Sequence, residues 1–140
     1  MKVRSVLMCL AACALSVCVP MTRGDPPKAQ DNTLVNALIQ VESNGNDKAI
    51  GDNGAAVGCL QIHKVMVDDV NRILGKQKFT YNDRLDRSKS IAMFNIFTDH
   101  YSPGASDEVK ARRWNGGPKG DSKTATQAYW RKVQRQIKNE

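Results

Sequence analysis

Residues 42–62 of the chain read ESNGNDKAIGDNGAAVGCLQI. Glu42 closes a stretch whose apolar residues recur at helical spacing, and a segment rich in glycine, asparagine and aspartate follows it. Glycine costs a helix about 1 kcal/mol relative to alanine, so this segment does not continue the helix. We call residues 46–57 the tongue. The sequence therefore places a carboxylate where a helix gives way to the tongue, after which residues 58–62 (GCLQI) resume the apolar pattern.

The helix before the tongue is predicted over residues 32–42. Its apolar residues fall on one face at helical spacing: Leu34, Val35, Leu38 and Val41. Asp31 or Asn32 is the predicted N-cap, and Gly45 marks the end. This pattern indicates a helix that buries one face in a core.

Turn chemistry within the tongue predicts a small β-hairpin. Asp52-Asn53-Gly54 separates Ala49-Ile50 from Ala56-Val57, and Asn-Gly pairs favour the tight turns that join antiparallel strands.

Two helices are predicted directly after the tongue. Residues 64–74 carry apolar residues at helical spacing and stop at Gly75. After a loop over residues 76–85, Ser88 is the predicted cap of a helix that extends to Tyr101.

Two more helices complete the predicted architecture, which is mainly α with one small β-tongue. Ser106 starts a helix with acidic residues in its first turn, and residues 115–118 (NGGP) break it after Trp114. The last helix begins near Thr124, which with Gln127 fits a capping box. Its apolar stripe consists of Tyr129, Val133 and Ile137.

The start of the chain is typical of a secretory signal peptide. Lys2 and Arg4 form a basic head, and residues 6–19 (VLMCLAACALSVCV) carry no charge. This apolar stretch is too short to span a bilayer comfortably. We expect cleavage after Gly24 and therefore a secreted or periplasmic protein. Residues 10–13 (LAAC) resemble a lipobox, but cleavage there would leave a very short apolar core, so simple export is favoured over a lipid anchor.

The expected organisation has three parts: a signal peptide over 1–24, a polar linker over 25–31 and one folded domain over 32–140. Cys9, Cys13 and Cys18 leave with the signal peptide, so they do not form a disulfide framework. The remaining Cys59 is flanked by Gly and Leu, which favours a small buried residue over a thiol nucleophile. About 110 residues can bury an adequate core without disulfides.

Charge narrows the class of partner. The whole chain carries a net charge of +7, and three of its 21 basic residues lie in the signal, which leaves 18 basic and 14 acidic residues, or +4. A modest positive charge suits an anionic polymer such as a cell wall. No basic stripe interleaved with aromatic residues is present, so nucleic acid is not an expected partner. A cationic membrane-active protein receives little support from so small a charge.

Glu42 is the candidate acid. It follows Leu38 and Val41 on a helix that is expected to be buried, and desolvation raises the pKa of a carboxyl toward the range that a general acid at neutral pH requires. From the helical pattern alone, a glutamate that merely caps or solvates the helix end is the simpler interpretation.

Three motifs together resemble those of soluble lytic transglycosylases and goose-type lysozymes. Glu42-Ser43 with Ala49, Gly54-Ala55, Gly58 and Gln61-Ile62 resembles the first motif of the family. Residues 113–118 (RWNGGP) resemble its Tyr-Asn-Ala-Gly-Pro loop, and residues 126–133 (TQAYWRKV) resemble its closing helix. The motifs occur in the family's order and span residues 33–137. The resemblance implies an α+β lysozyme-like fold, a helical bundle around a substrate cleft with the hairpin tongue at its side.

The resemblance also implies roles for single residues. Glu42 matches the general acid/base that protonates the oxygen between N-acetylmuramic acid and N-acetylglucosamine, and Tyr129 matches the tyrosine whose hydroxyl reaches it. Gln61 matches a residue of the cleft, and Asn115 matches a substrate-binding asparagine. Ser43 and Gly116, which adjoin these positions in the motifs, complete the expected substrate-binding set together with Asp52.

Departures from the family pattern bear on the reaction. The usual serine of the transglycosylase tongue is absent near Gly51 and Asp52, and residues 51–54 instead resemble the goose-type Gly-Asp-x-Gly segment, whose aspartate helps position water. That branch's second aspartate would fall at His63. Because an inverting hydrolysis needs a carboxylate base, and Asp52 alone is available, we favour the non-hydrolytic reaction that ends in a 1,6-anhydro sugar.

Two alternatives stay open at this stage. One is a goose-type hydrolase in which Asp52 positions water, and the other is a non-catalytic wall-binding or secretion-apparatus subunit.

Peptidoglycan strands are the expected partner, and we expect a monomer without membrane insertion once the signal is removed. No metal or organic cofactor is implied, because His63 and His100 are far apart and lack a ligand spacing.

Overall fold

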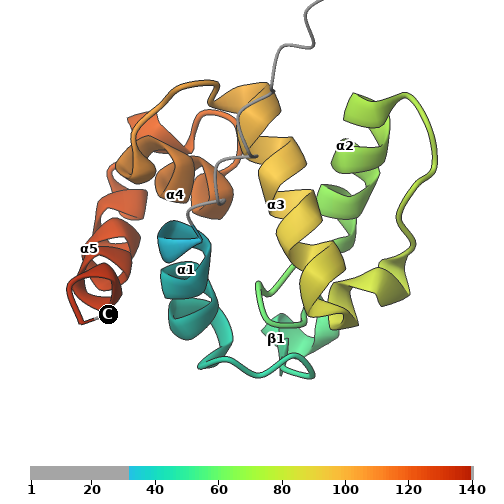
Figure 1. The fold of residues 1–140 in the computed structure, drawn as a ribbon, viewed down its shortest axis with the longest axis horizontal. Coiled ribbons are helices and arrows are strands. Elements are labelled where there is room, and N and C mark those ends of the chain that lie inside the picture. Colours follow the sequence, from blue (N-terminus) through green and yellow to red (C-terminus); the bar gives the residue numbers. More distant parts are fainter. Residues whose placement is uncertain (1–31, 140) are drawn as a thin grey trace, which may run out of the picture.

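A computed structural model describes residues 32–139 of the chain (Figure 1). This part contains the following helices and strands: α1 (Thr33–Ser43), β1 (Ile50–Gly51), β2 (Ala56–Val57), α2 (Lys64–Leu74), α3 (Arg87–Tyr101), α4 (Asp107–Gly116) and α5 (Ala125–Ile137), with short 3₁₀ helices η1 (Asp52–Gly54), η2 (Tyr81–Leu85) and η3 (Gly120–Ser122). The mainly helical class with one small antiparallel sheet is confirmed. The predicted signal peptide and linker, residues 1–31, lie outside the described residues.

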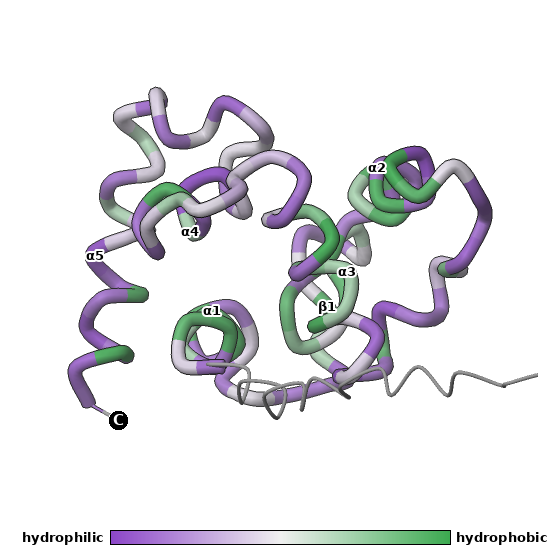
Figure 2. The backbone as a smooth tube through the Cα atoms, turned by 45° about the horizontal axis from the view of Figure 1, so that its top comes forward, coloured by the Kyte–Doolittle hydropathy of each residue, from purple (hydrophilic) through white to green (hydrophobic). Residues whose placement is uncertain are grey.

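Helix α1 is the centre of the fold. It lies between α3 and α5, and α2 packs on the far side of α3 (Figure 1). Ala37 and Leu38 on α1 are fully buried, as are Met93 on α3 and Val133 on α5. The hydrophobic positions of α5 lie on the side turned toward α1, while the rest of that helix is hydrophilic (Figure 2). Burial of α1 on several sides fixes the position of its last turn, which carries Glu42.

Aromatic packing joins α3 to α4. The ring of Trp114 meets Phe94 edge-on with centroids 5.2 Å apart and Phe97 with centroids 5.7 Å apart. T-shaped contacts of this kind add to the free energy gained by burial. They hold the end of α4 beside α1. No helix among residues 32–139 is both long and apolar enough to cross a membrane.

Most predicted helix limits are confirmed, and the corrections concern caps. Ser106 caps α4, and α2 ends at Gly75, which adopts the left-handed conformation with φ of 64°. The cap of α3 is Asp86 instead of the predicted Ser88, because the Asp86 carboxylate accepts the backbone N–H of Lys89 at 3.0 Å. Asn32 is the N-cap residue of α1, although its side chain makes no capping hydrogen bond.

The C-terminal elements bring two further corrections. Helix α4 does not stop at Trp114 but continues through Asn115 to Gly116. The capping box predicted at Thr124 is wrong, because Thr124, the N-cap residue of α5, has αR backbone angles and its side chain makes no capping hydrogen bond. A capping box forms instead at Thr80 and Asp83, in the segment predicted to be a loop, where it starts η2.

The hairpin of the tongue is confirmed. Strands β1 and β2 pair antiparallel, with Ile50 opposite Val57 and Gly51 opposite Ala56, and η1 forms the turn. Asp52 and Asn53 have positive φ, at 46° and 53°, a conformation that Asn and Asp tolerate better than most residues.

A buried arginine anchors the tongue to η2. Arg84 is only 7% exposed and has no carboxylate partner among residues 32–139. Its guanidinium donates to the carbonyl oxygens of Tyr81 at 2.7 Å, Ala55 at 3.2 Å and Ile62 at 3.1 Å. A buried charge is tolerated only when its donors find acceptors. These bonds fix Ala55, just before β2, and Ile62, at the end of the segment that follows β2.

Candidate active site

Glu42 lies in the last turn of α1 and is partly buried. Burial raises the pKa of its carboxyl above the ordinary value, and the negative charge of Asp52 acts in the same direction. The Tyr129 hydrogen bond, His63 and Lys132 lower the pKa but do not cancel the effect of burial. The carboxyl is therefore poised to hold a proton closer to neutral pH than a surface glutamate.

Tyr129 on α5 orients this acid. Its hydroxyl donates a hydrogen bond of 2.6 Å to Oε1 of Glu42. Burial, together with the neighbouring Glu42 charge, keeps the pKa of Tyr129 well above its ordinary value, so the phenol stays a donor. The two residues are 87 positions apart in the sequence and meet because α5 packs along α1. The bond occupies one carboxyl oxygen and leaves Oε2 to carry a proton.

A cavity of about 590 Å³ opens beside Glu42. Residues from α1, the tongue, the segment that joins it to α2, α2 itself and the end of α4 line it: Glu42, Asp52, Ala56, Leu60, Gln61, Ile62, His63, Val65, Met66, Trp114, Asn115 and Gly117. Four of the predicted site residues thus share one cavity: Glu42, Asp52, Gln61 and Asn115. Ser43, Gly116 and Tyr129 do not line it.

Ser43 and Gly116 hold the backbone around the cavity in the structure. The Ser43 hydroxyl donates to the carbonyl of Cys59 at 2.8 Å and so ties the end of α1 to the segment after the tongue. The carbonyl of Gly116 accepts from Nζ of Lys123 at 2.6 Å. Their substrate-binding roles stay predictions.

Gln61 adopts a conformation that is uncommon for a residue with a side chain. Its φ is 45°, and its amide Nε2 donates to the Gly58 carbonyl at 2.9 Å. The other amide atom lies over Gly51, where an added Cβ would stand 2.3 Å from Oε1. A positive φ outside glycine costs roughly 1–3 kcal/mol and is often found where a side chain is held for function. Gly51 leaves room for the Gln61 side chain to sit at the cavity wall.

Asn115 stands exposed at the end of α4, on a support that the sequence did not reveal. Arg113 makes two hydrogen bonds to the Asp121 carboxylate, at 2.8 Å and 3.0 Å, and also contacts the carbonyl of Tyr101. A bidentate arginine–carboxylate pair fixes direction as well as distance. The end of α4 is thereby held against both α3 and η3.

Eight of the residues that line the cavity had no predicted role in the site, and three of these bear on its chemistry: Val65, Met66 and His63. Val65 is 72% exposed although apolar, and Met66 lies beside it on α2, where they add apolar surface to the polar groups of the wall. An apolar residue off the buried face of α2 is the signal that could have identified Val65. His63, noted only as a departure, contacts Asp52 across 3.1 Å.

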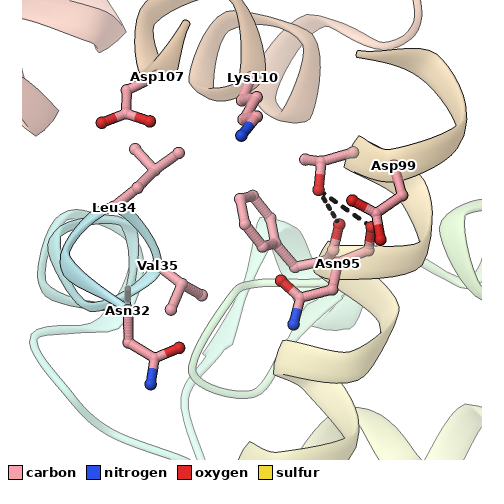
Figure 3. Close-up of a pocket in the computed structure, with 9 residues that line it drawn as sticks. Asn32, Leu34, Val35, Asn95, Asp99, Asp107 and Lys110 are labelled. Atoms are coloured by element: carbon pink, nitrogen blue, oxygen red, sulfur yellow. Dashed lines mark hydrogen bonds between the residues drawn. The ribbon is translucent and has the colours of Figure 1, made fainter. Parts of the chain in front are cut away.

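A smaller cavity, of about 270 Å³, lies between α1, α3 and α4 (Figure 3). Asp107 and Lys110 from α4 and Asn95 and Asp99 from α3 stand around it, with Leu34 from α1 on its wall. It holds none of the predicted site residues. Within residues 32–139, no group of three or more His, Cys, Asp or Glu side chains is arranged to hold a metal ion.

The chain was compared with known proteins. A family model described as the transglycosylase SLT domain matches residues 26–137, which is most of the chain and includes all three motifs. No curated protein matches the sequence. The match agrees with the mainly helical fold and confirms the resemblance to soluble lytic transglycosylases that the motifs indicated. The chain belongs to the transglycosylase SLT domain family, whose members have peptidoglycan-cleaving activity of the lytic transglycosylase type.

Proposed function

We propose that this protein is a lytic transglycosylase that cleaves the β-1,4 bond between N-acetylmuramic acid and N-acetylglucosamine, with Glu42 as general acid and then base. Membership of the family supports the substrate class. The single observation that carries the residue assignment is the partly buried Glu42, oriented by the 2.6 Å bond from Tyr129, at the wall of a cavity. A carboxyl with a raised pKa and a fixed orientation meets the requirements of a general acid.

The reaction uses one carboxyl twice. Protonated Glu42 gives its proton to the glycosidic oxygen as the bond to C1 of the muramic acid breaks. The resulting carboxylate then takes the proton of the 6-hydroxyl on the same sugar while that oxygen bonds to C1. The products are a free 4-hydroxyl on N-acetylglucosamine and a 1,6-anhydromuramic acid, and no water is consumed.

Hydrolysis is the second candidate, because Asp52 lines the same cavity as Glu42. Digestion of purified peptidoglycan in oxygen-18-labelled water, followed by mass spectrometry, separates the two reactions. We expect anhydro ends that are one water lighter than reducing ends and carry no label. Labelled reducing ends as the main product would assign the protein to the hydrolases.

We also propose that the domain acts outside the cytoplasm, in the periplasm or after secretion, because its proposed substrate lies there and the sequence of residues 1–24 is typical of a signal peptide. N-terminal sequencing of the exported protein tests the cleavage site at Gly24. A mature protein that begins at Cys13 and carries lipid would show the lipobox interpretation to be right.

The Tyr129→Phe variant tests the orientation of the acid. Loss of the hydroxyl removes a hydrogen bond that lowers the pKa of Glu42, so that pKa rises and the alkaline limb of the pH–rate profile moves to higher pH. We expect kcat to fall about tenfold at the new optimum, because the carboxyl is no longer held by a donor. A profile unchanged in both position and height would contradict the role of Tyr129.

The matched control for this variant is Tyr101→Phe. The Tyr101 hydroxyl also bonds a carboxylate, Oδ2 of Asp69 at 2.9 Å, but neither residue lines the cavity at Glu42. We expect its pH–rate profile to match that of the unchanged protein.

A further inference from the structure

The only hydrogen bond of the Asp52 side chain within the described residues comes from His63. Nε2 of His63 lies 3.1 Å from Oδ2 of Asp52, and because a carboxylate only accepts, Nε2 carries the proton. Asp52 belongs to η1 at the tip of the tongue, while His63 directly precedes α2. The bond therefore connects two separate walls of the cavity that contains Glu42.

This pair does little for the stability of the fold. The side chains of His63 and Asp52 are 46% and 70% exposed, and ion pairs so exposed to water contribute little to stability. His63 makes no side-chain cap on α2, so α2 does not depend on the imidazole. What the bond does determine is the direction of the Asp52 carboxylate, which sits on a turn and would otherwise rotate freely.

The direction of the Asp52 carboxylate matters because this group brings a negative charge into the cavity that contains Glu42. Charged groups from three elements act on the pKa of Glu42: Asp52 from the tongue, His63 from the start of α2 and Lys132 from α5. Among them only Asp52 is negative. Cleavage of a glycosidic bond passes through a transition state with positive charge on the sugar ring. A fixed negative group in the same cavity stabilises that charge more than the neutral ground state, which is the condition for catalysis.

We propose that His63 is a positioning residue that holds the Asp52 carboxylate toward the substrate cavity, where its negative charge stabilises the positive charge developing on the sugar. This inference rests on the proposed function, and it is independent of whether an anhydro or a reducing end results. It also gives a role to His63, which stands where goose-type lysozymes have their second aspartate.

Steady-state cleavage by four variants tests the proposal. Asp52→Asn is expected to lower kcat about 30-fold with KM changed less than about threefold, because the lost interaction belongs to the transition state. It also removes a charge that raises the pKa of Glu42, so the alkaline limb of its pH–rate profile moves to lower pH. His63→Ala is expected to lower kcat about fivefold, and His63→Gln, which retains an N–H donor, to recover most of that loss. In the double variant Asp52→Asn/His63→Ala, the loss should equal that of Asp52→Asn alone.

Asp99 and His100 provide the matched controls. They are exposed neighbours at the end of α3, outside the cavity that contains Glu42, and their replacement by Asn and Ala makes the same chemical changes. We expect both control variants to keep the original kcat. Thermal unfolding within a few degrees of the original protein confirms that each variant is folded.

Three results would overturn the proposal. They are full kcat in His63→Ala, failure of His63→Gln to exceed His63→Ala, and losses that add in the double variant. Each is distinct from failure of the proposed function, which would appear as no cleavage by the unchanged protein or as full cleavage after replacement of Glu42.

Discussion

The Glu42→Gln variant is expected to lose cleavage of purified peptidoglycan by about a thousandfold, the middle of the range that general acid catalysis contributes. Glutamine has nearly the same shape as glutamate, and its amide oxygen can still accept the bond from Tyr129. It cannot release a proton to the glycosidic oxygen or take one back. The loss should therefore appear in kcat, while binding of glycan strands measured by co-sedimentation with cell walls stays unchanged.

Stability supplies the control for this variant. Burial raises the pKa of Glu42 in the folded protein above its unfolded value, so the contribution of this group to stability is fully present at low pH and is lost as the pH rises through the folded pKa. Each unit of such a shift costs about 1.4 kcal/mol at higher pH. Glutamine avoids this cost, and the variant should unfold at the same temperature as the original protein near pH 4 and at an equal or higher temperature at pH 7.

The outcomes separate the remaining interpretations. Full cleavage by Glu42→Gln would remove the catalytic assignment. Wall binding without cleavage by the unchanged protein would identify a non-catalytic subunit that retains the fold. A folded variant that binds and does not cleave supports the proposed enzyme.

Sequence reasoning located the candidate site where local signals agreed with the family motifs. The apolar stripe of residues 32–42 predicted a buried helix, and the turn at Asp52-Asn53-Gly54 predicted the hairpin that lines the cavity. The meeting of Glu42 and Tyr129 was implied by the resemblance, since no local pattern indicates that two residues 87 positions apart share a hydrogen bond.

Features that depend on tertiary contacts were missed. Arg84 reads as a surface residue in the sequence, yet three carbonyl oxygens from η2, the tongue and the segment after it surround its guanidinium. The cap of α3 lies two residues before the predicted Ser88 because Asp and Ser compete for the same backbone donors, and the choice of Asp86 depends on how the chain enters α3. The contact between His63 and Asp52 required the folded tongue.

The second large effect is expected in the Gly58→Ala variant, which should unfold or lose about 3 kcal/mol of stability. Gly58 has φ of 84°, a conformation that costs an alanine about 1–2 kcal/mol. A Cβ added there would also lie 1.7 Å from the backbone oxygen of Arg84 and 2.8 Å from its carbonyl carbon. Forcing an extra methyl group into packed structure typically costs a further 1–3 kcal/mol or so.

The clash at Gly58 cannot be relieved locally. The Arg84 oxygen that it meets accepts a hydrogen bond from Ser90 at 3.1 Å, and the Arg84 guanidinium holds Ala55 and Ile62 on either side of Gly58. Moving η2 away from the tongue would therefore break the bonds that bury a charge. The displaced tongue carries Asp52, and the segment that follows it carries Gln61. Cleavage activity should therefore fall together with stability.

Gly54→Ala separates the two causes. Gly54 has a similar φ of 93°, but nothing lies within 4 Å of an added Cβ there. This variant should lose only the conformational cost, about 1–2 kcal/mol. For a domain of this size, 1 kcal/mol corresponds to roughly 4–8 °C in the unfolding temperature, so circular dichroism melts should place Gly58→Ala clearly below Gly54→Ala. Equal melting temperatures would mean that the approach of Gly58 to Arg84 does not hold the tongue in place, and the cavity wall that carries Asp52 would then need another support.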